Sequence, residues 1–152
     1  MKYWLMKSEP DVYSIDTLKK DKTTLWDGIR NYQARNFMMK DMEVGDQVLF
    51  YHSNSKPPGI AGLATVSKSA APDPTAFDKK SKYFCEKSSK ENPRWFCVEV
   101  KYKKKFKNYI PLDEIKVTKK LEDIMVIKKG ARLSIQPVTK KEYDLLCKMG
   151  DA

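Results

Sequence analysis

The stretch Glu43–Val66, EVGDQVLFYHSNSKPPGIAGLATV, predicts the centre of the fold. After a turn at Gly45, the apolar run Val48–Tyr51 is typical of a strand that is covered on both faces of its sheet. The segment NSKPPG indicates a turn, and residues 60–66 indicate the next strand. We therefore expect a hairpin with a long loop in the middle of the chain.

Three other segments have the pattern of strands. Residues 3–8, YWLMKS, predict a first strand that ends before Pro10, with Trp4 in the core. Residues 95–102, WFCVEVKY, alternate between the two faces of a strand. Residues 132–137, RLSIQP, predict the last strand. Five or so strands are expected in all.

Short helices separate these strands, and capping residues mark where they begin. The helices are expected over residues 15–21 and 32–40, twice between 110 and 130, and after residue 139. Their clearest N-caps are Ser14, Asn31 and Thr139, the last in a capping box with Glu142.

The remaining segments, residues 22–30 and 67–94, are expected to be irregular. Long connections in compact domains are often functional, so the second segment is a candidate for a binding loop. Strands and helices that do not alternate regularly favour an α+β fold. We expect a small mixed barrel with short helices packed outside, in one domain.

The charge balance narrows the classes of partner. The chain has 152 residues and a net charge of +10, which suggests an anionic partner, although a lysine-rich solvated surface would give the same total. No apolar run approaches the roughly 20 residues of a membrane span, and no secretory signal is evident. We expect an intracellular monomer, cytoplasmic or nuclear in a eukaryote, that does not bind membranes.

Residues that commonly carry catalysis or bind metals are few. The three cysteines lie far apart without a CxxC pair, and His52 is the one histidine, so we expect no metal site and no cofactor. No phosphate-cradling, hydrolase or zinc-protease motif occurs. His52 and Ser53 are neighbours that a strand would send to opposite faces, which is poor geometry for a base and a nucleophile. These features predict a protein that binds without catalysis.

Trp26 stands in LWDGIRNYQARNF, residues 25–37, where polar groups follow it at once. Core tryptophans usually have apolar neighbours, so two interpretations remain open: buried packing, or a flat surface on which a base stacks. Removing a core tryptophan costs roughly 3–5 kcal/mol of stability. Removing a stacking wall would mainly weaken binding.

Polar side chains at strand ends and in loops could hold the edge of such a base or its phosphates. Ordinary turn and capping roles explain the same polar residues. Tyr83 is either a loop anchor or a second stacking wall, and Trp95 either covers a helix or lines a pocket mouth. The candidate site residues are Lys7, Ser8, Trp26, Arg30, Asn31, Ser53, Asn54, Tyr83 and Trp95.

The segment KYKKKFK, residues 101–107, places five lysines beside two aromatic residues. A solvated strand edge would look the same, because edge lysines discourage pairing between sheets. Given the net charge, we favour a phosphate-binding patch. Its lysines are Lys101, Lys103, Lys104, Lys105 and Lys107.

Seven motifs, in this order, carry a resemblance to a known family: YWLMKSEP, WDGIRNYQARNF, GDQVLFYHSN, PPGIAGLATV, DPTAFD, NPRW and KGARLSIQPV. Together they resemble the EVE-domain proteins, from residue 2 to about residue 148. Cys85 stands where the family pattern favours Asp, a departure that leaves the resemblance intact.

The resemblance implies a PUA-like fold, related to YTH domains, with residues 1–152 forming a single EVE domain. It implies a non-catalytic module whose partner is nucleic acid carrying a modified base, of the 5-methylcytosine type in DNA or a modified base in RNA. Trp26 matches a tryptophan of the aromatic cage in YTH domains, and Lys7 and Ser8 match the pair that ends their first strand. The alternatives are an enzyme acting on a modified nucleotide and a protein-interaction adaptor.

Overall fold

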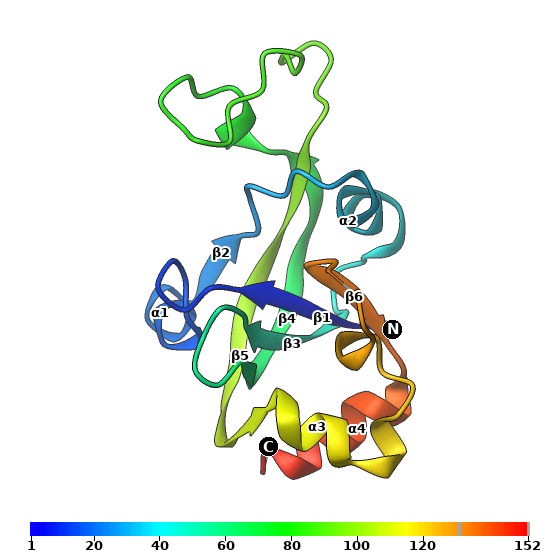
Figure 1. The fold of residues 1–152 in the computed structure, drawn as a ribbon. Coiled ribbons are helices and arrows are strands. Elements are labelled where there is room, and N and C mark those ends of the chain that lie inside the picture. Colours follow the sequence, from blue (N-terminus) through cyan, green and yellow to red (C-terminus); the bar gives the residue numbers. More distant parts are fainter. Residues whose placement is uncertain (131, 152) are drawn as a thin grey trace.

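A mixed sheet of six strands forms the body of the structure, a computed structural model that describes residues 1–130 and 132–151. The strands are β1 (Tyr3–Ser8), β2 (Thr23–Leu25), β3 (Gln47–His52), β4 (Gly59–Pro72), β5 (Phe96–Pro111) and β6 (Ile135–Val138). They lie in the order β2-β5-β4-β3-β1-β6. Figure 1 shows a strongly coiled sheet, with β4 and β5 running up the molecule and β1 and β3 crossing them. Ala131, inside the KGARLSIQPV motif, and Ala152 lie outside the described residues.

Strand β3 is covered on both faces, as its apolar run predicts. It pairs with β4 in antiparallel orientation, which confirms the hairpin, and with β1 in parallel orientation. Val48 and Phe50 enter one core cluster, whereas Leu49 and Tyr51 enter a second cluster on the other face. Because each face meets its own core, this strand has no solvent side.

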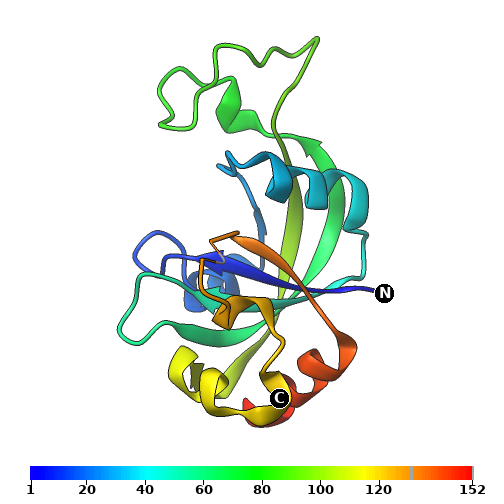
Figure 2. The same ribbon diagram turned by 45° about the vertical axis from the view of Figure 1, so that its right-hand side comes forward.

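In the described part of the chain, four short helices pack outside the sheet: α1 (Ile15–Asp21), α2 (Tyr32–Asn36), α3 (Leu112–Val117) and α4 (Lys140–Met149). Figures 1 and 2 show α3 and α4 together at one end of the molecule, with α1 and α2 farther along the sheet. The predicted N-caps are confirmed, since side chains of Ser14, Asn31 and Thr139 each accept a hydrogen bond from a backbone N–H in the first turn. The expected α+β class, with short helices outside a mixed sheet, is also confirmed.

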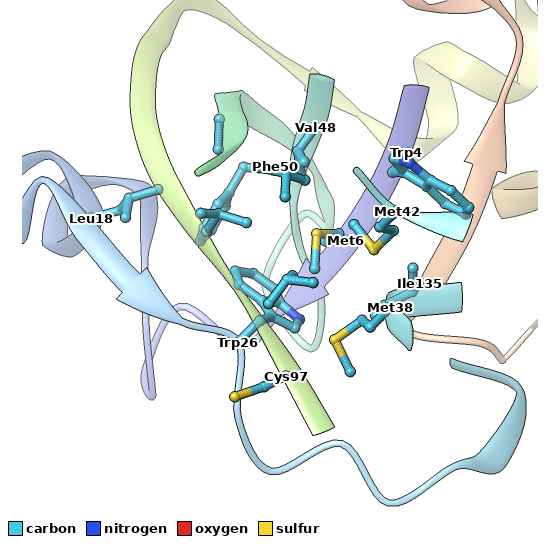
Figure 3. Close-up of a cluster of buried hydrophobic side chains, with 14 of the residues drawn as sticks. Trp4, Met6, Leu18, Trp26, Met38, Met42, Val48, Phe50, Cys97 and Ile135 are labelled. Atoms are coloured by element: carbon cyan, nitrogen blue, oxygen red, sulfur yellow. The ribbon is translucent and has the colours of Figure 1, made fainter. Parts of the chain in front are cut away.

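The first core cluster contains both Trp4, as predicted, and Trp26. Figure 3 shows Trp26 among the sulfur-containing side chains of Met6, Met38 and Cys97. The Trp26 ring meets the Phe50 ring edge-on, with 5.6 Å between the centroids. This cluster carries the cavity described below, because Trp26 belongs to both.

Several strands differ from the sequence-based expectation, among them β6, which was expected over residues 132–137 and is found at Ile135–Val138. Strand β4 continues to Pro72 and β5 to Pro111, and the short strand β2 lies inside a segment expected to be irregular. Strands β4 and β5 pair with each other along most of their length, through several register shifts. Main-chain hydrogen bonds thus hold a long two-stranded ribbon in which the register shifts interrupt the alternation of side chains. Without that alternation, the sequence shows no period-2 pattern that would predict the full length of these strands.

Helical boundaries differ as well. The helix expected over 32–40 ends at Asn36 and continues as a wider turn over Phe37–Asp41. Between 110 and 130, α3 is followed by two single 3-10 turns, Lys119–Leu121 and Met125–Ile127, in place of a second helix. The buried residues there are Leu121, Ile124 and Val126, and one continuous α-helix would not bring that spacing to one face.

Candidate functional site

An open cavity of about 540 Å³ lies where β1 ends. Three separate parts of the chain line it: the end of β1 with the turn that follows, β2 with residues 26–29, and two residues of the connection between β4 and β5. The parallel pairing of β1 with β3 brings Ser8 opposite His52, so both strands end at this edge. Four predicted site residues line the cavity: Lys7, Ser8, Trp26 and Tyr83.

Trp26 is both a core residue and a wall of the cavity. Its side chain is only 7% exposed, and its backbone N–H donates to the Val98 oxygen over 2.8 Å, which extends the pairing of β2 with β5. Its ring packs against Phe50 and the rest of the first core cluster, and the residue also lines the cavity. The structure therefore confirms the packing interpretation, and stacking on a base stays a prediction.

Tyr83 lies against Gly28 and lines the cavity together with Trp26. Gly28 has a φ of +77°, a conformation that favours glycine. A Cβ at this position would lie 2.7 Å from the Cε2 and Cζ atoms of the Tyr83 ring. Any larger residue would thus strain the backbone and displace the tyrosine, so the glycine fixes where this wall stands.

Asp73, a fully buried carboxylate, ties the two walls together. Its Oδ2 accepts hydrogen bonds from Gly28 N–H over 2.8 Å and from Arg30 Nη1 over 3.0 Å. Arg30 in turn donates from Nη2 to the backbone oxygen of Tyr83 over 2.6 Å. Burial raises the pKa of Asp73, but hydrogen bonds from Thr75, Gly28 and Arg30 outweigh it and hold the pKa below its usual value.

Arg30 is therefore not a cavity-lining residue, although it was predicted to hold a base or its phosphates. Its guanidinium is engaged by Asp73, Thr75 and two backbone oxygens, and it lies 5.6 Å from the centroid of the Tyr83 ring. A planar group with several donors suits such a bridging position better than an ammonium would. In this geometry Arg30 positions a wall of the cavity.

The end of β1 contributes two polar side chains. Ser8 Oγ donates to the Tyr13 backbone oxygen over 2.6 Å, which closes the turn between β1 and α1. Lys7 is half-buried beside Tyr51, with 5.7 Å between Nζ and the ring centroid, and burial lowers the pKa of its ammonium. A partly desolvated cation at the cavity wall is well placed to attract an anionic group.

Three other predicted residues lie outside the cavity lining. Asn31 caps α2 by accepting from Ala34 N–H over 3.0 Å. Ser53 N–H donates to the Ser8 oxygen over 3.0 Å, so it lies next to the site without lining it. Asn54 donates to Glu9 Oε1 over 2.5 Å. For these three, the turn and capping roles are the ones that the structure records.

Trp95 covers a helix. Its ring stacks on Tyr32 of α2 with 4.7 Å between centroids, and the guanidinium carbons of Arg30 and Arg35 lie 5.2 and 5.8 Å from its centroid. Its indole N–H is buried, and among the residues that the structure describes its interaction with the Cys85 thiol falls outside ordinary hydrogen-bond geometry. Through Arg30 and Tyr32, Trp95 packs against the segment that follows β2.

The five lysines of the predicted phosphate patch extend along β5, outside the cavity lining. Three of them have partners within the chain. Lys103 Nζ donates to Gln47 Oε1 over 2.6 Å, Lys105 pairs with Asp16 over 2.8 Å, and Lys107 pairs with Asp151 over 3.5 Å. The two ion pairs are exposed and stabilise little, so Lys105 and Lys107 can exchange them for phosphates, whereas Lys103 is bonded to the buried Gln47.

Most residues of the site were not among the predicted site residues, and four of these carry polar side chains that matter for its geometry: Glu9, Tyr13, Asp27 and Asp73. Glu9 and Asp27 place carboxyl groups at the cavity, and burial, followed by the charge of Asp73, raises the pKa of Asp27. The motif DPTAFD contains Asp73, which caps the turn Pro74–Ala76 through its side chain. An Asp before Pro predicts that cap, but its bonds to Gly28 and Arg30 depend on residues more than 40 positions away.

Two further observations concern chemistry. His52 Nε2 accepts from Ile15 N–H over 3.2 Å, and burial lowers its pKa, so the imidazole is neutral and occupied at neutral pH. Among residues 1–130 and 132–151, no three His, Cys, Asp or Glu side chains are grouped to hold a metal ion. Over the same residues, no helix has the length and apolar character to cross a bilayer.

Comparison with known proteins gives a consistent family match. The family model described as the EVE domain matches residues 2–149. Thymocyte nuclear protein 1 of Gallus gallus is 42% identical over 163 residues, which cover 95% of this chain and 66% of that protein. The chain thus spans about two thirds of the length of this curated relative.

Solved structures match over nearly the whole chain. A hypothetical protein from Leishmania major is 47% identical with a TM-score of 0.93, covering 99% of this chain and 95% of that one. Human THYN1 in complex with DNA containing 5-methylcytosine is 40% identical with a TM-score of 0.91, covering 100% of this chain and 99% of that one. The fold described above is the fold of these proteins.

Proposed function

Because this chain belongs to the EVE domain family, we propose that it is a nucleic-acid-binding domain that recognises a modified base of the 5-methylcytosine type. One observation carries the proposal. An open cavity walled by Trp26 and Tyr83 occurs on the same fold as human THYN1, which has been solved with DNA containing 5-methylcytosine. The proposal treats residues 1–152 as one domain acting as a monomer.

The cavity offers the interactions that hold an extruded base. Aromatic rings of Trp26 and Tyr83 provide faces for stacking, which contributes about 1–3 kcal/mol per base. Glu9 and Asp27 provide carboxylate oxygens, which accept hydrogen bonds from an exocyclic amino group such as that of cytosine. A methyl group on the base adds apolar area against the rings, so it strengthens binding without needing a polar partner.

Positive charge supplies the rest of the affinity. Lys7 and Lys82 stand at the cavity, and the net charge of +10 attracts the phosphate backbone from a distance. These contacts bind any sequence, whereas the cavity selects the base. The proposed domain therefore binds through two separable sets of contacts, one to the phosphates and one to the base. Neither set converts the ligand.

The same proposal includes a cellular location. The relatives are named thymocyte nuclear protein, which supports an intracellular role, nuclear in a eukaryotic cell.

The test is a titration with two oligonucleotides of one sequence, one containing 5-methylcytosine and the other cytosine. We expect tighter binding of the methylated form, a steep loss of affinity for both with rising salt, and no change in the mass of either after incubation. Equal binding of the two forms at every salt concentration would contradict base recognition. A new product would show that the domain is an enzyme.

A further inference from the structure

Two exposed apolar side chains stand at the mouth of the cavity. Val12, in the turn between β1 and α1, is 63% exposed, and Leu25, the last residue of β2, is 44% exposed. Both belong to the cavity lining, and Figure 1 shows β2 on the left of the molecule, where β1 also ends. Exposed apolar side chains beside a cavity are available to pack against apolar faces of whatever binds there.

Leu25 is held in place by the sheet. It pairs with Glu99 of β5, and the next residue, Trp26, donates its N–H to the Val98 oxygen over 2.8 Å. Its position relative to the stacking wall is therefore fixed by the backbone. A side chain on a paired strand is aimed more accurately than one on a free loop.

A base in a duplex reaches a cavity of this kind only by leaving its stack, which costs a few kcal/mol and opens a gap between its neighbours. Proteins that distort duplexes fill such gaps with apolar side chains, leucine among them. A single strand has no gap to fill, because its bases are not held in a paired stack. Any residue that fills the gap thus affects duplex binding alone.

We infer that Leu25 and Val12 form an apolar lip that packs on the base pairs flanking the extruded nucleotide, with Leu25 entering the gap. This inference rests on the proposed function. The lip lowers the cost of extrusion, and so it makes duplex DNA accessible to the cavity. The lysines Lys7 and Lys82 at the same cavity hold the adjacent phosphates.

The test compares affinities for a methylated single strand and the matching methylated duplex. We expect L25A to weaken duplex binding about tenfold, which corresponds to about 1.4 kcal/mol, and V12A to weaken it less. Single-strand binding should not change for either variant. The matched controls V44A and V117A remove exposed valines outside the cavity lining, and should leave both affinities unchanged.

A second readout detects the gap itself. A 2-aminopurine placed beside the methylated base fluoresces more when its stack opens. We expect the wild type to raise the 2-aminopurine fluorescence of the duplex. The increase caused by L25A should differ in magnitude from the increase caused by the wild type. Equal losses by L25A on both forms of DNA would make Leu25 an ordinary cavity residue and overturn the lip. If the wild type does not prefer methylated DNA in either form, the proposed function itself fails.

Discussion

Trp26 belongs both to the core and to the cavity lining, and its sequence context reflects both. Asp27 and Gly28, which follow it directly, line the cavity, and Gly28 must accommodate Tyr83. The ring itself lies in the core beside Phe50. The neighbours of Trp26 in the sequence therefore indicated only its position at the cavity. Its core contact is with Phe50 of β3, which lies more than 20 positions away in the chain.

We expect W26A to lower the free energy of unfolding by roughly 3 kcal/mol and also to abolish the preference for methylated DNA. W26F should keep part of both, because a smaller ring still fills space and offers a face. Thermal melting and titration with the paired oligonucleotides measure the two effects. The control F50L should lose stability alone, since Phe50 does not line the cavity. If W26A folds and still prefers methylated DNA, the Trp26 ring has a packing role only and does not recognise the base.

The three cysteines should differ sharply in reactivity. The indole N–H of Trp95 does most to lower the pKa of Cys85, whereas burial raises the pKa of Cys97 to about 12 and also raises that of Cys147. A lower pKa gives more thiolate at neutral pH, and the thiolate is the reactive form. We expect iodoacetamide at neutral pH to label Cys85 first, as mass spectrometry of tryptic peptides would detect. Faster labelling of Cys97 would contradict this environment.

At the scale of elements, the connection between β4 and β5 acts as the second half of the site. Asp73 and Tyr83 belong to it, and both are joined to the segment after β2 through Arg30. The sequence analysis marked this long connection as a candidate for a binding loop, and two of its residues, Lys82 and Tyr83, line the cavity. Its hydrogen bonds were not predictable, because each joins residues that pattern analysis treats separately.

We expect D73N to destabilise the fold by about 1–3 kcal/mol at neutral pH, because buried donors on Gly28 and Arg30 lose a charged acceptor. The folded pKa of Asp73 is depressed, so its contribution is complete above the unfolded value of about 3.9 and is lost as pH falls through the folded value. The difference between D73N and wild type should therefore shrink in acid. Urea unfolding at neutral pH and at about pH 3 measures it, and an equal difference at both would contradict the assignment.

The long ribbon of β4 and β5 is the element that sequence analysis described least well. Capped helices and the doubly covered strand were predicted because caps and apolar runs are local signals. The ribbon depends on pairing between strands with shifted registers, and its lysines hide the strand pattern. Among the cavity residues, those at the ends of predicted strands, Lys7 and Ser8, were found for the same local reason.

At the scale of the whole molecule, charge is distributed over more than the cavity. The lysines on β5 extend along one strand, several of them in exposed ion pairs, while the cavity mixes Lys7 and Lys82 with two acidic residues. Under the proposed function, general attraction and base selection would therefore belong to different surfaces. The sequence predicted the total charge, but only the fold separates these two contributions.

We expect replacement of Lys103, Lys104 and Lys105 by Ala to weaken binding to methylated and unmethylated DNA alike. The plot of log affinity against log salt should become shallower by about 0.9 for each phosphate that the variant no longer neutralises. The control replaces Lys119, Lys120 and Lys141, which lie toward α3 and α4 and remove the same charge. If both triple variants behave identically, net charge alone matters and the patch on β5 has no special position.

The pairing of β1 with both β3 and β6 has a consequence for how the protein matures. The first strand of the chain has a free edge until residues 135–138 arrive to cover it, and the cavity at its end lacks a wall until Tyr83 is in place. Contacts between residues so far apart in the sequence form late and slowly, because the entropy cost of closing a long loop comes before the contacts stabilise the chain. A chain still emerging from the ribosome would therefore have its lysines exposed well before it has a base-selective cavity, and it would meet nucleic acid first as an unselective polycation.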